Sequence, residues 1–132
     1  MQGNSVKENV DQLVEFARRT GLDISIILND YQLSIEAKNT EAFNARENYV
    51  GFDLLSKKGE RGTFEIEGKN GKVVVRLRAP QCVDGICAKR VEIYGKLQIL
   101  EAKGSEGDIK IKANILNLSL IHISEPTRQA EI

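Results

Sequence analysis

The sequence contains no tryptophan and a single histidine, His122, which lies in the C-terminal stretch 118–132. Without a histidine before that stretch, residues 1–117 cannot build the Ser–His or Cys–His pairs of nucleophilic catalysis. Aromatic residues make up 5% of the chain, which is too few for a platform on which nucleic-acid bases stack. The composition therefore predicts no catalytic residues and disfavours nucleic-acid binding.

Motifs for phosphate and metal binding are also absent. The chain has no GxGxxG, P-loop, calcium-loop, HExxH or paired CxxC motif, so we expect no cofactor and no metal. Its 19 basic and 19 acidic residues balance, which leaves no strong positive field for nucleic acid. No apolar run approaches the ~18 residues of a membrane span, and the N-terminus MQGNSVKENV is polar. We therefore expect a cytoplasmic protein that does not bind membranes.

The C-terminal stretch differs from the rest of the chain. LSLIHISEPTR, which begins at Leu118, is similar to a translation of the adapter DNA used in transposase-based sequencing libraries, and QAEI fits the variable index that follows. The resemblance implies that 118–132 is a non-native tail on a gene recovered from environmental or other bulk DNA. The alternation in LSLIHIS would also suit a natural edge strand. Because such tails are excluded from fold reasoning, we expect one domain over 1–117 that lacks its natural C-terminus.

An amphipathic helix is predicted from Ser5 to about Gly21. Ser5 and Glu8 have the spacing of a capping box, which satisfies free amides of the first turn. Arg18 and Arg19 suit the negative end of the helix dipole, and Gly21 can take the left-handed conformation that ends a helix. Five apolar residues recur at helical spacing and predict the face that packs on the core: Val6, Val10, Leu13, Val14 and Ala17.

Most of the remaining chain shows the alternation of apolar and polar residues that is typical of strands. Residues 24–28 and 33–37 are predicted to form a hairpin around Asn29-Asp30, because both turn residues tolerate positive φ. Residues 40–47 are predicted as a short helix and 50–54 as a strand, because one helix over both would carry apolar residues on opposite faces.

The most specific strand pattern is TFEIEGKNGKVVVRLR, which covers 63–78. A type I′ turn at Asn70-Gly71 sets the register of this hairpin. Four cross-strand pairs follow from that register: Phe64–Leu77, Ile66–Val75, Glu65–Arg76 and Thr63–Arg78. Glu65 and Arg76 then form an exposed ion pair, worth about 0.2–1 kcal/mol and with no catalytic meaning.

The last third of the domain is also predicted as strands. Residues 90–100 form one long strand that bends at Gly95, 101–107 form a turn, and 108–116 form a strand with its isoleucines inward. Together these elements predict an α+β domain. One N-terminal amphipathic helix packs on a curved, mainly antiparallel sheet of five to seven strands.

Cys82 and Cys87 are the two cysteines of the chain. Their spacing does not match a zinc site, which needs four ligands. We expect two half-buried thiols in a reducing compartment. A disulfide or a redox-active pair requires that the loop between them fold back.

Two sets of residues are candidates for binding a ligand or partner. Lys72, Arg76 and Arg78 form a basic strand face that could hold an anion or an acidic partner. An ordinary solvated face is the alternative, because Glu65 and Glu67 would balance the charge. The second set, with the two cysteines, could line a pocket at one end of the sheet: Tyr49, Asp53 and Asp84.

Three functions are compatible with these features. The absence of catalytic groups favours a non-catalytic binding or assembly module, which contacts a protein partner or a second copy through a sheet edge. The alternative is a small-ligand-binding or enzymatic domain with a pocket under the helix. VDGICAKRVEIYG and SEGDIKIKANIL resemble the windings of bactofilins, bacterial β-helix proteins, and this resemblance implies a polymer. The order of elements is similar to Roadblock-type regulatory domains in topology alone.

Overall fold

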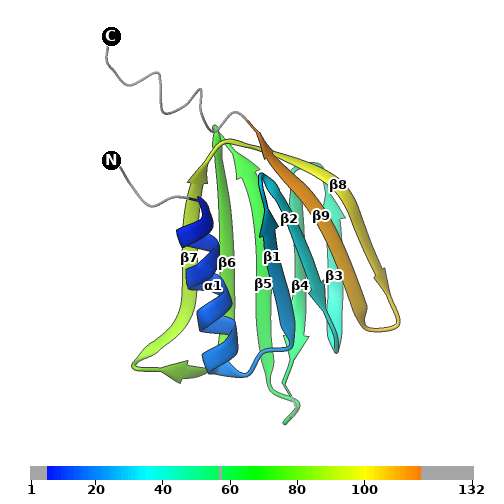
Figure 1. The fold of residues 1–132 in the computed structure, drawn as a ribbon. Helices are drawn as coiled ribbons and strands as arrows, with labels where there is room; N and C mark the ends of the chain where they lie inside the picture. Colours follow the sequence, from blue (N-terminus) through cyan, green and yellow to red (C-terminus); the bar gives the residue numbers. More distant parts are fainter. Residues whose placement is uncertain (1–5, 57, 117–132) are drawn as a thin grey trace.

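The computed structural model describes residues 6–56 and 58–116, which contain one helix and nine strands (Figure 1). The elements are α1 (Val6–Thr20), β1 (Ile24–Asn29), β2 (Gln32–Ala37), β3 (Thr40–Arg46), β4 (Tyr49–Leu55), β5 (Arg61–Lys69), β6 (Lys72–Val83), β7 (Ile86–Tyr94), β8 (Lys96–Ser105) and β9 (Asp108–Leu116). A four-stranded sheet has the order β1-β2-β9-β8, and a five-stranded sheet has the order β3-β4-β5-β6-β7. The described strand pairs are antiparallel. The predicted tail over 118–132 lies outside the described residues.

The prediction of a helix with antiparallel strands is confirmed, but the prediction of a single sheet of five to seven strands is wrong. The chain leaves the five-stranded sheet after β7 and enters the four-stranded sheet at β8, with Gly95 at a φ of 155° between them. The predicted bend is therefore present, and it divides the expected long strand between two sheets. The turn expected over 101–107 is shorter, because β8 pairs with β9 as far as Ser105.

Helix α1 ends as predicted. The Gly21 amide donates to the Arg18 carbonyl at 3.3 Å and the Leu22 amide to the Ala17 carbonyl at 3.1 Å, with Gly21 at a φ of 73°. This is the Schellman arrangement, which satisfies two free carbonyls of the last turn. The capping box cannot be compared, because Ser5 lies outside the described residues.

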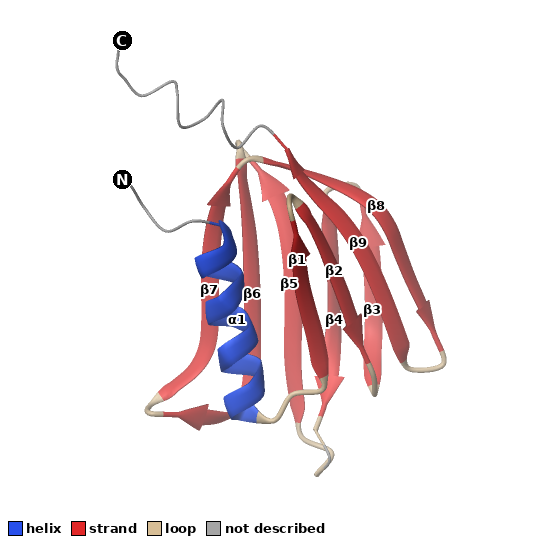
Figure 2. Ribbon diagram, in the orientation of Figure 1, coloured by secondary structure: helices blue, strands red, loops and turns tan. Residues whose placement is uncertain are grey.

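The predicted apolar face of the helix is wrong at one residue. Val14 is 41% exposed, whereas Phe16 is buried beside Val10, Leu13 and Ala17. The helix lies along one flank of the sheets and contacts β1, β6 and β7 (Figure 2). The face of α1 that is buried therefore differs from the predicted apolar face: it includes Phe16 and leaves out Val14.

The β5–β6 hairpin has the predicted register, including the pairs Phe64–Leu77 and Glu65–Arg76. The β1–β2 turn is displaced by one residue: it is Asp30-Tyr31, with Asp30 at a φ of 57°. This register places Leu28 opposite Leu33 and leaves Tyr31 exposed in the turn.

The helix predicted over 40–47 is wrong, because this segment is the edge strand β3. It pairs with β4, with an irregularity between Glu41 and Asn44 and with Ala42 at a φ of 55°. Pairing with β4 satisfies backbone groups that an isolated two-turn helix would leave weakly bonded. The bulge also blunts an edge that could otherwise template aggregation.

The core fills the space between the sheets and under the helix. The rings of Phe52 and Phe64 stack there, with centroids 5.1 Å apart. The largest fully buried side chains come from the helix and both sheets: Phe64, Leu13, Leu33, Ile35, Leu54, Ile66, Leu77, Ile111 and Ile115. Within residues 6–56 and 58–116, no helix has the length and apolar character needed to cross a bilayer.

Candidate functional site

The predicted basic face lies on the outer surface of the five-stranded sheet, and acidic neighbours neutralise much of it. Arg76 lies 3.6 Å from Glu65 and 4.0 Å from Glu67, and Lys72 lies 3.3 Å from Glu92. The predicted Glu65–Arg76 ion pair is therefore present. In the described part of the chain, Arg78 forms no ion pair, but it is exposed on a flat strand surface. This arrangement is an ordinary solvated sheet face.

Tyr49 is fixed on the same outer face. Its hydroxyl donates a hydrogen bond of 2.7 Å to the Glu65 carboxylate, and the Arg46 guanidinium lies 4.3 Å above its ring. Burial raises the pKa of the Tyr49 hydroxyl above its usual value, and the hydrogen bond to Glu65 and the charge of that carboxylate raise it further. The nearby Arg46 charge opposes this shift without reversing it.

This shift predicts a loss of stability at high pH. The folded state holds the Tyr49 proton more tightly than the unfolded state, so the stabilisation is complete below the unfolded pKa of about 10. It is lost as the pH rises through the higher folded pKa. Tyrosinate absorbance at 295 nm, which tryptophan does not obscure here, should therefore lose a component with a midpoint above pH 10 in Tyr49→Phe. A lost component with a midpoint at or below pH 10 would contradict the assignment.

The second predicted set does not form one pocket. Asp53 lies on the outer face of β4 and contacts Arg61 at 3.3 Å. Asp84 lies in the turn between β6 and β7, where its carboxylate accepts a 2.8 Å hydrogen bond from Arg19 of the helix. Tyr49 and Asp53 therefore belong to one surface, and Asp84 and the cysteines belong to another.

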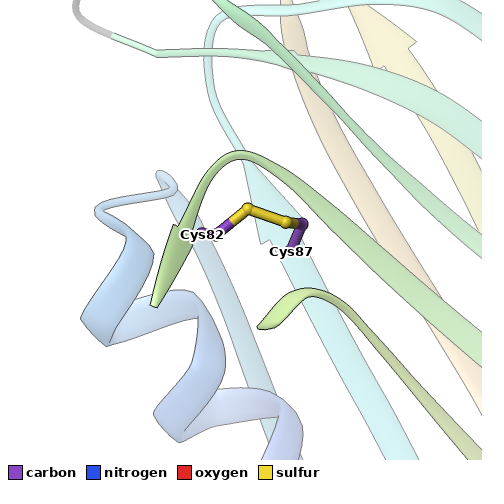
Figure 3. Close-up of a disulfide and its surroundings, with 2 residues drawn as sticks. All are labelled: Cys82 and Cys87. Atoms are coloured by element: carbon purple, nitrogen blue, oxygen red, sulfur yellow. A yellow bond between two sulfur atoms is a disulfide. The ribbon is translucent and has the colours of Figure 1, made fainter. Parts of the chain in front are cut away.

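The expectation of two half-buried thiols is wrong, because Cys82 and Cys87 form an exposed disulfide (Figure 3). Their Cα atoms are 4.1 Å apart across the end of the β6–β7 hairpin. The bridge closes over a tight turn in which Asp84 and Gly85 have positive φ. That turn folds the loop back, as a disulfide between the two cysteines requires.

A groove lies between this hairpin end and the helix. It has a volume of about 330 Å³. Its apolar part consists of Phe16 from the helix and Val83 and Ile86 from the hairpin, and Ile86 is 48% exposed. Charged and polar residues complete the lining: Asp11, Gln12, Glu15, Arg19 and Lys89. We call this the helix–hairpin groove.

Lys89 is the distinctive residue of the groove. It pairs across the strands with Leu77, which is fully buried, so its side chain leaves β7 on the core-facing side. Lys89 is half-buried, and within the described residues its ammonium group has no ion pair. The other charges of the groove have partners: Asp11 with Lys7, Glu15 with Arg18, and Arg19 with Asp84. The groove thus combines an apolar surface with one unpaired positive charge.

The sequence contains a signal for Lys89 that the prediction missed. Val91 and Ile93 are alternating apolar residues of the predicted strand, and continuing this alternation backward along the strand puts Lys89 on the same face. Phe16 and Ile86 carried no such signal, because the groove exists only where the helix and the hairpin end meet.

A larger groove of about 520 Å³ lies where β1, β2, β8 and β9 end near the helix–β1 connection. Carboxylates and ammonium groups line it in equal number: Asp23, Glu36, Asp108, Lys38, Lys103 and Lys110. This balance favours neither an anion nor a cation. In the described residues, no group of acidic, histidine or cysteine side chains could hold a metal ion.

No protein-family model, curated protein or solved structure matches this chain. These comparisons therefore supply no role for the helix–hairpin groove. The function proposed below rests on the side chains of this chain alone.

Proposed function

We propose that the protein is a non-catalytic binding module that holds a segment of a protein partner in the helix–hairpin groove. The observation that carries this proposal is the unpaired Lys89 beside an apolar surface. Covering the exposed Ile86 side chain and pairing the half-buried Lys89 ammonium group would both be favourable, and a complementary partner would do both.

The groove indicates the chemistry of that partner. Phe16, Val83 and Ile86 fit one apolar side chain, and Lys89 fits a carboxylate next to it. Burial of one apolar side chain contributes about 1.5–3 kcal/mol, and the entropy lost on association opposes it. The segment is therefore an acidic, partly apolar peptide that binds with modest affinity.

The alternatives receive less support. Self-association through a sheet edge requires an open strand, and all four edge strands are obstructed or irregular. Helix α1 lies against β1 and β7, and a bulge interrupts each of β3 and β8. A bactofilin-like polymer would be built from parallel windings, whereas the described pairs are antiparallel. A ligand site under the helix would need space that Val10, Leu13 and Ala17 fill.

Peptide selection tests the proposal. A random peptide library displayed on phage is selected on the full chain, and the affinity of the enriched peptides is measured by titration calorimetry. We expect peptides with an acidic residue next to an apolar one, whose affinity falls at least about tenfold in Ile86→Ser. In Lys89→Gln, the peptides should lose the preference for an acidic residue.

Ile27→Ser is the matched control. Ile27 is 59% exposed on β1 and does not line the groove, and its replacement should leave the affinity unchanged. Equal affinity for the Ile86→Ser and Ile27→Ser variants would reject the groove, as would a selection that enriches no peptide.

A further inference from the structure

The end of the β6–β7 hairpin is weakly attached to its own sheet. The two strands pair regularly up to Arg78 and Ala88, and pairing resumes only at Val83 and Ile86. Between these points β6 has four residues, 79–82, opposite Cys87 alone. The ladder is therefore interrupted just before the tip, which we define as residues 83–86.

Within the described residues, four links hold the tip and the strand ends beside it. They are the single pair between Val83 and Ile86, the ion pair between Asp84 and Arg19, the hydrogen bond of 3.3 Å from Gln81 to Glu60, and the Cys82–Cys87 disulfide. The ion pair and the side-chain hydrogen bond are exposed, and such contacts contribute little. The disulfide is therefore the strongest of the four links. It spans the interruption in the ladder, with α1 alongside (Figure 3).

The tip also forms part of the binding site. Val83 and Ile86, the two apolar residues of the tip, are two of the three apolar residues that line the helix–hairpin groove. Any change that releases the tip therefore removes most of the apolar surface of the groove.

We propose that the Cys82–Cys87 disulfide is a redox switch for this groove: the oxidised protein presents it, and reduction releases the tip and dismantles it. Release of the tip does not depend on the proposed function, whereas the loss of peptide binding rests on it. Both cysteines are exposed, and exposed disulfides are the ones that external thiols reach and reduce. For a protein of the cytoplasm, where disulfides are transient and redox-sensing, such a bridge reports oxidising conditions.

The reaction is an exchange with an external dithiol, such as a small dithiol or a reducing protein with two vicinal thiols. One thiolate of the dithiol attacks one sulfur of the bridge, which forms a mixed disulfide and releases the other cysteine as a thiolate. The second thiol of the dithiol then displaces the first cysteine. The protein gains two electrons and the two protons of the dithiol, and the dithiol becomes a disulfide.

Amide hydrogen exchange on the full chain tests the switch without any ligand. Peptides that cover 79–88 should exchange at least about tenfold faster after treatment with dithiothreitol, and peptides from β5 should not change. The Cys82→Ser/Cys87→Ser double variant should match the reduced protein and should not respond to dithiothreitol. An unchanged tip would overturn the switch. Faster exchange in β5 would also overturn it, since the bridge would then stabilise the whole domain.

Binding separates the switch from the proposed function. A peptide selected on the oxidised protein should bind at least about tenfold more weakly to the reduced protein and to the double variant. Equal affinity in both redox states would overturn the control of binding. If the tip is released but no peptide is selected, the switch is supported and the peptide partner is rejected.

Discussion

Phe64→Ala should lower the free energy of unfolding by about 3–5 kcal/mol, the range measured for phenylalanine truncations in protein cores. Phe64 is 0% exposed, pairs with Leu77 on β6 and stacks on Phe52 from the neighbouring strand. Its removal loses the transfer free energy of the ring and leaves a cavity that these neighbours cannot close, because strand pairing fixes them on both sides. A loss of this size is a large part of the stability of a small domain.

Urea denaturation provides the measurement. Circular dichroism suits it better than fluorescence, because the chain has no tryptophan. Phe43→Ala is the matched control: Phe43 is 37% exposed on the edge strand β3, where it contacts Gly104. We expect Phe43→Ala to cost clearly less than Phe64→Ala, because more than a third of the Phe43 side chain is already in contact with water in the folded state. Equal losses of unfolding free energy for the two variants would contradict the position of Phe64 at the centre of the core.

The sequence predicts those parts of the fold in which local signals agree with one another. In the β5–β6 hairpin, Asn70-Gly71 sets the turn, and the resulting register pairs apolar with apolar and Glu65 with Arg76. The end of α1 was predictable for the same reason, since Gly21 and Arg18 both indicate a C-terminus. In each case a turn residue and the hydrophobic pattern specify the same structure.

The errors occur where contacts distant in sequence decide the structure. Residues 40–47 have a weak pattern of their own, and β4 makes them a strand by offering its edge. Nothing local indicates that Gly95 carries the chain from one sheet to the other, because a bent strand and a change of sheet leave the same alternation. The buried face of α1 depends on where two sheets meet, and so Phe16 replaces Val14.

The candidate site follows the same division. The charged outer face could be predicted from alternation, and it was, down to the Glu65–Arg76 pair. The helix–hairpin groove could not, because it exists only where the end of the β6–β7 hairpin meets the helix. The spacing of Cys82 and Cys87 permits both thiols and a bridge. Asp84 and Gly85, which turn tightly between them, were the available evidence for the bridge.

Gly68→Ala should also destabilise the domain strongly, although the change adds a single methyl group. Gly68 lies on β5 where the five-stranded sheet meets β8 of the other sheet, and a Cβ there would lie 2.7 Å from the Cβ of Leu97. A Cβ atom cannot rotate out of the way, so the strands must separate. We expect a loss of about 1–3 kcal/mol, the usual cost of overpacking a core, measured by urea denaturation.

Gly51→Ala is the control that separates crowding from the loss of a glycine. A Cβ at Gly51 would collide with the hydroxyl end of Tyr49, which can turn toward solvent only by giving up its hydrogen bond to Glu65. Its cost should therefore be about 1 kcal/mol, the net contribution of one hydrogen bond, and smaller than that of Gly68→Ala. Leu97→Ala should fail to rescue Gly68→Ala, because alanine keeps the Cβ that makes the contact. Rescue would show that the outer part of the leucine side chain, and not the approach of the two backbones, limits the space between the sheets.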